Sequence, residues 1–147
     1  MTKRRVFITG CGGMLGEAFY HYFNDKSILY ASDIDVNEEW LTYLDVRDYS
    51  EYRKQVLDFK PDICMHLPAF TDLEYCELHP AETYNTNTTA VENSVFAAKE
   101  VGATLVYIST AGIFNGKKEY YDDWDTPDPI NIYGRSKYMG ELFIEKN

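Results

Sequence analysis

The chain has 147 residues, with 14 Lys and Arg against 24 Asp and Glu, and therefore a formal charge of −10. Hydrophobic residues make up 45% of the chain and aromatic residues 16%, which is enough to build a core and excludes a disordered or low-complexity protein. The acidic balance argues against broad electrostatic binding to nucleic acid or to an anionic membrane. No apolar run approaches the roughly 20 residues that cross a bilayer.

The N-terminal residues and the cysteines predict a cytoplasmic protein. The basic start, residues 1–5, reaches Gly10 without the longer apolar stretch and the cleavage site of a signal peptide. Cys11, Cys64 and Cys76 form no Cys-x-x-Cys pair and have no metal-ligand spacing with a histidine. We therefore expect reduced thiols and no metal site.

Apolar runs of strand length alternate along the chain with stretches of helical period. Strands are expected at residues 5–9, 28–32, within 40–44, at 63–66 and at 104–109. Helices are expected at residues 14–23, from 48 or 50 to 59, at 80–101 and at 133–146, with residues 75–87 as the cap of the third helix and a polar loop at 112–132. Continuous apolar strands suit a sheet that is buried on both faces, so this order predicts a doubly wound parallel sheet with helices on both faces.

Three glycines mark the point where the first strand turns into the first helix. Gly10, Gly13 and Gly16 are three residues apart. Glycine permits the sharp turn, lets the backbone approach a pyrophosphate, and allows the helix to pack closely on the strand. The helix N-terminus adds free N–H groups and the positive end of its dipole. The spacing predicts a dinucleotide-binding loop, with a turn that uses glycine for geometry alone as the alternative.

An acidic residue follows the second strand. Asp33 lies 23 residues after Gly10, where a carboxylate can accept hydrogen bonds from the hydroxyls of the adenosine ribose. Asp35 competes for this role, both can be ordinary turn residues, and Asp45 is a third candidate near the expected adenine. No Lys or Arg lies near Asp33, between residues 28 and 39, to hold a 2′-phosphate. NAD(H) is therefore favoured over NADP(H).

A tyrosine and a lysine open the last predicted helix on one face. Tyr133 and Lys137 are four residues apart, and a free phenol has a pKa of about 10, too high for efficient proton exchange at neutral pH. A nearby ammonium stabilises phenolate, so the pair makes a usable acid and base. The spacing alone arises by chance among 13 tyrosines, and its value lies in its position after the fifth strand. Ser109 and Thr110 supply hydroxyls at the carboxyl end of that strand.

With these residues assembled, the chain resembles the extended short-chain dehydrogenase/reductases, and among them the dTDP-4-dehydrorhamnose reductases and related nucleotide-sugar reductases. The resemblance runs through residues 9–16, 44–48, 66–71, 87–93, 109–116 and 129–141, of which the last, PINIYGRSKYMGE, is the most specific. It implies a Rossmann domain over residues 1–147. The cofactor-binding residues implied by these motifs are Gly10, Gly13, Met14, Leu15, Gly16, Asp33, Asp45, Val46, Ala69, Tyr133 and Lys137.

The resemblance also implies roles in catalysis. Tyr133 would donate a proton to the keto oxygen of a nucleotide sugar while reduced nicotinamide delivers hydride to the carbon. Lys137 would hold the nicotinamide ribose and assist the tyrosine, and Thr110 would hydrogen-bond the same oxygen. Ala111 and Gly112 stand where sugar-nucleotide dehydratases carry an Asp-Glu pair, which disfavours dehydration. A non-catalytic dinucleotide-binding or regulatory subunit and a sugar-nucleotide epimerase are the alternatives.

Three departures from the family pattern accompany the resemblance. The reductases usually carry Asp-Tyr at residues 111–112, and Pro68 interrupts a run of small residues after the fourth strand. Members of the family are nearly twice as long, so we expect a cofactor-binding part without its C-terminal substrate-binding region. Without that region, Leu142, Phe143 and Ile144 would be exposed. The region itself, a second copy in a homodimer or a partner chain would cover them.

Overall fold

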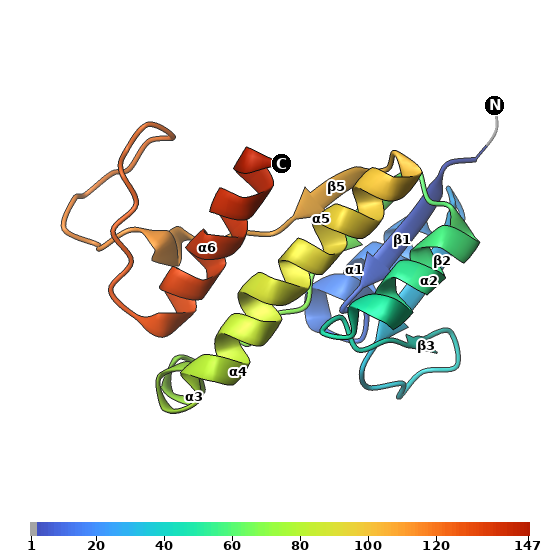
Figure 1. The fold of residues 1–147 in the computed structure, drawn as a ribbon, viewed down its shortest axis with the longest axis horizontal. Helices are drawn as coiled ribbons and strands as arrows, with labels where there is room; N and C mark the ends of the chain where they lie inside the picture. Colours follow the sequence, from blue (N-terminus) through green and yellow to red (C-terminus); the bar gives the residue numbers. More distant parts are fainter. Residues whose placement is uncertain (1–2) are drawn as a thin grey trace.

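Five parallel strands form the sheet at the centre of the computed structural model, which describes residues 3–147 (Figure 1). The strands are β1 (Arg5–Thr9), β2 (Ile28–Asp33), β3 (Thr42–Tyr43), β4 (Ile63–His66) and β5 (Thr104–Tyr107). Their order is β3-β2-β1-β4-β5, so the chain winds outward from β1 in both directions. The predicted doubly wound sheet is confirmed.

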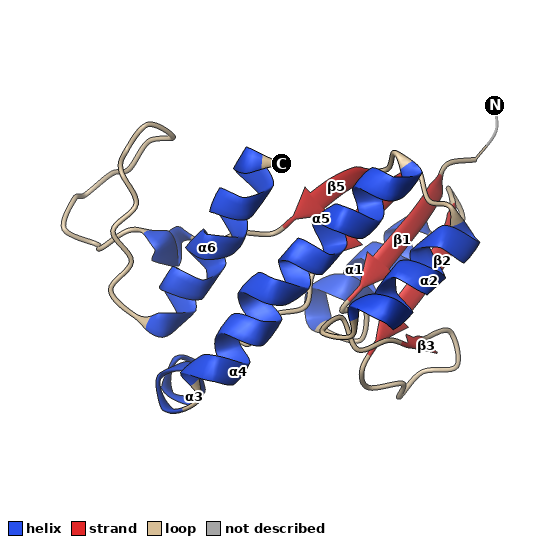
Figure 2. Ribbon diagram, in the orientation of Figure 1, coloured by secondary structure: helices blue, strands red, loops and turns tan. Residues whose placement is uncertain are grey.

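Helices cover both faces of this sheet (Figure 2). The helical segments are α1 (Met14–Phe23), α2 (Tyr49–Phe59), α3 (Leu73–Leu78), α4 (Pro80–Tyr84), the π-helical turn η1 (Asn85–Thr89), α5 (Ala90–Val101), the 3₁₀ turn η2 (Ala111–Ile113) and α6 (Ile132–Lys146). Helix α1 lies on one face, whereas α2 and α5 pack side by side on the other with α6 next to α5. Among the described residues, no helix is long and apolar enough to cross a membrane.

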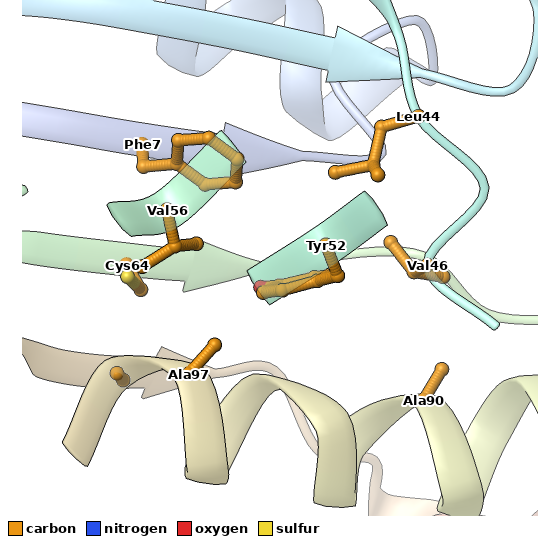
Figure 3. Packing of buried hydrophobic residues seen from close by; sticks show 9 residues of the cluster. Phe7, Leu44, Val46, Tyr52, Val56, Cys64, Ala90 and Ala97 are labelled. Atoms are coloured by element: carbon orange, nitrogen blue, oxygen red, sulfur yellow. The ribbon is translucent and has the colours of Figure 1, made fainter. Parts of the chain in front are cut away.

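The alternation of side chains along β1 builds the two halves of the core. Phe7 points toward α2 and α5, where it joins a buried cluster with Tyr52 and Val56 of α2 (Figure 3). Val6 and Ile8 point the other way and pack against aromatic side chains of α1. Each such buried side chain contributes about 2 kcal/mol relative to an exposed one. The apolar run of β1 is therefore what a strand covered on both faces requires.

Local signals fix several helix ends. The Asp48 carboxylate accepts a hydrogen bond from Glu51 N at 3.1 Å and caps α2, which decides between the two helix starts, 48 and 50, that the sequence left open. Gly102, at a φ of 71°, ends α5 in the left-handed conformation. Asn131 caps α6 through Gly134 N at 2.7 Å, so this helix begins one residue earlier than expected.

Residues 72–89 differ from the prediction of a simple cap for one long helix. Asp72 caps the separate helix α3 by accepting from Tyr75 N at 2.7 Å, and Pro80 opens α4 at its first position. The chain then widens into η1, whose Asn and Thr side chains bond to groups outside the helix. The predicted helix over residues 80–101 is confirmed as the continuous run of α4, η1 and α5. The prediction of a simple cap over residues 75–87 was wrong, because these contacts, and not helix propensity, decide the local geometry.

The end of β5 and the last helix also depart from expectation. Tyr107, paired with His66, is the last residue of β5. The strand therefore ends two residues earlier than predicted, and residues 108–109 lie outside the sheet. Leu142, Phe143 and Ile144 are half-buried and not exposed. Phe143, for example, packs edge-on against Phe96 of α5, with the ring centroids 5.5 Å apart.

Candidate functional site

A cavity of about 370 Å³ lies beyond the carboxyl ends of the strands. Its walls come from the segments that follow β1 (Gly10, Gly12, Gly13), β2 (Asp33, Asp35), β3 (Asp45, Val46, Arg47) and β4 (Leu67, Pro68, Ala69, Phe70), and from Thr86. Strand β1 lies between β2 and β4, because β2 and β3 are added to one side of β1 and β4 and β5 to the other, so the strand order reverses at this point. Open α/β sheets bind ligands in the crevice at such a switch point.

Two positions around the turn between β1 and α1 have no room for a side chain. Gly10 has a φ of +71°, and a Cβ there would lie 2.7 Å from the backbone nitrogen of Pro68. A Cβ at Gly16 would lie 2.5 Å from the carbonyl oxygen of Gly10 and would collide with Cα of Cys11. The first turn of α1 therefore rests directly on the backbone of the preceding bend, and both positions require glycine.

The N-terminus of α1 lacks a side-chain cap. Helices α2, α3 and α6 are each capped by a side chain, from Asp48, Asp72 and Asn131, whereas Gly13, the N-cap residue of α1, has none to offer. Gly12 and Gly13 are both exposed and line the cavity. The first-turn N–H groups of a helix have no partner within the helix, so the uncapped start of α1 next to the cavity is suited to an anion.

The Asp33 carboxylate is held in place at the cavity. One oxygen accepts a hydrogen bond from Gly12 N at 2.9 Å and the other accepts from Asp35 N at 3.1 Å. Asp35 also lines the cavity, so the structure places both candidate acids there. The bond from Gly12 joins the end of β2 to the glycine bend, so Asp33 lies beside the expected position of a diphosphate.

Asp45 forms a bidentate ion pair with Arg47, a residue that the sequence reasoning did not single out. The guanidinium donates from Nε to Oδ1 at 2.8 Å and from Nη2 to Oδ2 at 2.7 Å. These bonds hold the pKa of Asp45 below its ordinary value, so the carboxylate stays ionised. Arg47 lies beyond residues 28–39, the stretch around Asp33 that holds no Lys or Arg, although it lines the same cavity as Asp33.

The predicted cofactor-binding residues divide into three groups. Those that line the cavity are Gly10, Gly13, Asp33, Asp45, Val46 and Ala69. Met14 and Leu15 do not line it, and their side chains are exposed, while Gly16 is buried beneath the bend. Tyr133 and Lys137 lie outside the cavity, on α6.

Thr110 and Tyr133 lie together beside η2. A Cβ at Gly112 would be 3.3 Å from Oγ1 of Thr110 and 3.7 Å from Cε1 of Tyr133. A Cβ at Gly134 would collide with the carbonyl oxygen of Gly112, so the first turn of α6 packs directly on η2. The glycine at 112 leaves open the space next to the tyrosine ring and the threonine hydroxyl.

Lys137 is almost completely buried between α6 and β5. Its Nζ donates to the carbonyl oxygen of Ile108 at 2.6 Å and lies 4.1 Å from the centroid of the Tyr107 ring. Burial lowers the pKa of Lys137 to about 8. The contacts anchor the ammonium at the point where β5 leaves the sheet, one helical turn from Tyr133.

The depressed pKa of Lys137 predicts a pH dependence of stability. Between its folded value of about 8 and its higher unfolded value, the unfolded chain binds more protons, so stability rises with pH. From pH 7 to pH 9.5 the free energy of unfolding should rise by about 2 kcal/mol relative to that of a Lys137→Met variant. Urea denaturation of both proteins at both pH values measures the difference. Lys54→Met, which removes an exposed lysine, is the control, and its difference in free energy of unfolding from the wild type should be the same at both pH values. Parallel pH profiles of the wild type and Lys137→Met would contradict the account.

Asn87 connects the cavity wall to α6. Its Oδ1 accepts from Phe70 N at 2.8 Å, and its Nδ2 donates to Phe70 O at 2.9 Å and to Ser136 Oγ at 3.0 Å. Thr86, one residue earlier, lines the cavity, and its buried Oγ1 has no hydrogen-bond partner among the described residues. Neither was predicted, although the Asn-Thr-Asn-Thr-Thr run of η1 is a poor helix sequence and could have marked the site.

Other reactive groups nearby are inert in this environment. Burial lowers the pKa of His66 to about 3 and raises the pKa of Cys11 to about 12, so the imidazole is neutral and the thiol protonated at pH 7. Within residues 3–147, no group of three or more His, Cys, Asp or Glu side chains is placed to hold a metal ion.

A doubly wound parallel sheet with a glycine bend after β1 and an acid at the end of β2 defines a Rossmann-type α/β protein. The chain belongs to the family described as RmlD substrate binding domain, whose model matches residues 4–147.

The chain is similar over nearly its whole length to several known proteins. It is 36% identical to dTDP-4-dehydrorhamnose reductase from Bacillus anthracis str. Ames, whose crystal structure in complex with NADP superimposes with a TM-score of 0.91 over 99% of this chain and 50% of that one. Methionine adenosyltransferase 2 subunit beta from Xenopus tropicalis is 32% identical over 98% of this chain and 43% of its own length. Spore coat polysaccharide biosynthesis protein SpsK from Bacillus subtilis (strain 168) is 32% identical, with 98% and 48% covered. The chain thus spans about half the length of these relatives.

Proposed function

We propose that the chain is the cofactor-binding part of an NAD(P)H-dependent oxidoreductase that reduces a 4-keto nucleotide sugar. The observation that supports the proposal is the glycine-lined cavity together with the Thr110–Tyr133 pair beside η2, with Asn87 bonded to Phe70 in the cavity wall and to Ser136 of α6. The NADP complex of the Bacillus anthracis reductase supports it. The proposal places the protein in the cytoplasm, where its three free cysteines stay reduced.

In this proposal the bend holds the diphosphate through main-chain N–H groups. Gly10, Gly13 and Gly16 give the bend its shape, and the amides at Met14 and Leu15 face the anion through the backbone, which fits their exposed side chains. Asp33 accepts hydrogen bonds from the ribose hydroxyls. Its carboxylate would repel a 2′-phosphate, so NAD(H) is favoured and NADP(H) is the second choice. The adenine lies toward Asp45 and Val46, and the backbone at Ala69 borders the cofactor.

The second cluster supplies the proton. Reduced nicotinamide, when bound, supplies hydride to the carbonyl carbon. Tyr133 donates its hydroxyl proton to the carbonyl oxygen, so that the ketone becomes an alcohol and a phenolate remains. Lys137 stabilises that phenolate with its ammonium and binds the nicotinamide ribose. Thr110 donates a hydrogen bond to the same carbonyl oxygen, which keeps the carbonyl beside the tyrosine.

Thr86→Val is expected to weaken dinucleotide binding without loss of stability. Valine keeps the shape of threonine and removes a buried hydroxyl that has no hydrogen-bond partner within residues 3–147, so the free energy of unfolding should stay level or rise. In the complex, this hydroxyl bonds the ligand, and its loss should raise the Kd for NADH about fivefold. Calorimetric titration and urea denaturation give the two values.

Thr83→Val is the matched control. Thr83 is buried one turn earlier, and its hydroxyl donates to the carbonyl oxygen of His79 at 2.9 Å. Its replacement should cost about 1 kcal/mol of stability and leave the Kd unchanged. A wild-type Kd for NADH in Thr86→Val would show that the hydroxyl does not contact the ligand.

A second candidate function is a dinucleotide-binding subunit without turnover. Ala111 and Gly112 place no functional side chain beside Tyr133 and Thr110, and the similarity to a subunit of methionine adenosyltransferase 2 is in keeping with a role in a protein assembly. Such a subunit would bind the dinucleotide, and its Tyr133 would not take part in a reaction. Turnover is therefore the measurement that separates the two functions.

A further inference from the structure

Arg47 is the one basic side chain among the described residues that line the cavity. The other charged side chains there are acidic, and they include Asp33 and Asp45. None of the proposed contacts with the dinucleotide involves Arg47. Its backbone, its side chain and its surroundings together indicate which part of a ligand it meets.

Arg47 is fixed before any ligand arrives. Asn93 of α5 donates from Nδ2 to the carbonyl oxygens of Val46 at 3.0 Å and of Arg47 at 3.4 Å. The Arg47 N–H donates to Asp45 Oδ1 at 3.0 Å, and the guanidinium makes its two further bonds to the same carboxylate. The guanidinium plane therefore has a defined orientation, although the side chain is still 32% exposed.

The ion pair with Asp45 makes the Arg47 guanidinium a poor ligand for phosphate and leaves its plane available for stacking on an aromatic base. Its charge is balanced by Asp45 at hydrogen-bond distance, and the nearby carboxylate of Asp33 makes the surroundings acidic. A guanidinium is planar and weakly hydrated, and such planes stack on nucleobases. A neutralised guanidinium held rigid at a cavity wall thus suits an aromatic base better than a 2′-phosphate.

We propose that Arg47 is the stacking platform for the adenine base of the dinucleotide, an inference that rests on the proposed cofactor site. Asp45 then acts as a positioning residue, because its carboxylate sets the orientation of the guanidinium. This places the base beside the segment that follows β3 and leaves the glycine bend, which follows β1, for the diphosphate.

The test compares Arg47→Ala and Arg47→Lys with the wild type, using NADH, NADPH and reduced nicotinamide mononucleotide as ligands. Loss of the platform should raise the Kd for NADH and for NADPH equally, by about tenfold. The Kd for the mononucleotide, which has no adenine, should not change. Arg47→Lys keeps the charge without the plane and should behave like Arg47→Ala. Arg53→Ala is the matched control, because Arg53 makes the same bidentate type of pair with Glu100 away from the cavity.

Each other result is decisive. If Arg47→Ala weakened the binding of NADPH but not that of NADH, Arg47 would bind the 2′-phosphate, and the stacking role would be overturned. Wild-type affinity in Arg47→Lys would show that charge, and not the plane, matters, and it would also overturn it. A wild-type protein that binds neither dinucleotide would remove the proposed function itself, a failure that is seen before any variant is compared.

Discussion

Gly16→Ala is expected to abolish measurable dinucleotide binding and to lower the free energy of unfolding by about 3 kcal/mol. The added methyl group would lie 2.5 Å from the carbonyl oxygen of Gly10 and would collide with Cα of Cys11. Both are backbone atoms, so they cannot turn aside as a flexible side chain would. Helix α1 must move away from β1, and the bend loses the shape that brings its amides to the diphosphate.

Gly13→Ala is the control for this effect on stability. The nearest atom to a Cβ at Gly13 is the carbonyl oxygen of Gly10 at 3.6 Å, an ordinary contact, and its φ of −80° suits any residue. Its free energy of unfolding should therefore change by less than about 1 kcal/mol. Urea denaturation and calorimetric titration with NADH measure both variants. Wild-type stability and affinity in Gly16→Ala would refute the proposed packing of the bend.

Tyr133→Phe is expected to reduce turnover by about 10²- to 10⁴-fold, because it removes the proton donor. The assay uses a chimera in which residues 4–147 replace the matching half of the Bacillus anthracis reductase, with NADPH and dTDP-4-dehydrorhamnose as substrates. No hydrogen bond of the Tyr133 hydroxyl occurs within the described part of the chain, so stability and the Kd for NADPH should stay the same.

Tyr138→Phe provides the same chemical change on the same helix, and it should leave turnover intact. If the chimera is active and Tyr133→Phe retains that activity, the reductase mechanism is excluded. An inactive chimera that still binds NADPH would favour the second candidate, a dinucleotide-binding subunit.

Much of this architecture could be predicted because its causes are local. The apolar run of β1, the sharp bend at the spaced glycines and a helix that starts near residues 48–50 each depend on a few neighbouring residues, and the structure agrees with all three. The position of the cavity could be foreseen for a different reason, because the carboxyl ends of parallel strands must meet at one edge of the sheet.

The missing parts depend on contacts between distant segments. Asn87 bonds Phe70 and Ser136, which are 17 and 49 residues away, and no local pattern predicts such a bridge. Arg47 could not be predicted because it lies 14 residues after Asp33 and reaches the same cavity only from the segment that follows β3. Thr86 reaches the cavity through a π-helical turn, which helix periodicity does not anticipate.

The most direct test of the cofactor site is an amide-resolved NMR titration of the ¹⁵N-labelled chain with NADH. If main-chain N–H groups hold the diphosphate, the signals of Gly13, Met14 and Leu15 should shift together and saturate with a single Kd. Asp33, which accepts a hydrogen bond from Gly12 N, should respond with them. Unchanged signals at these residues with millimolar NADH would contradict the account.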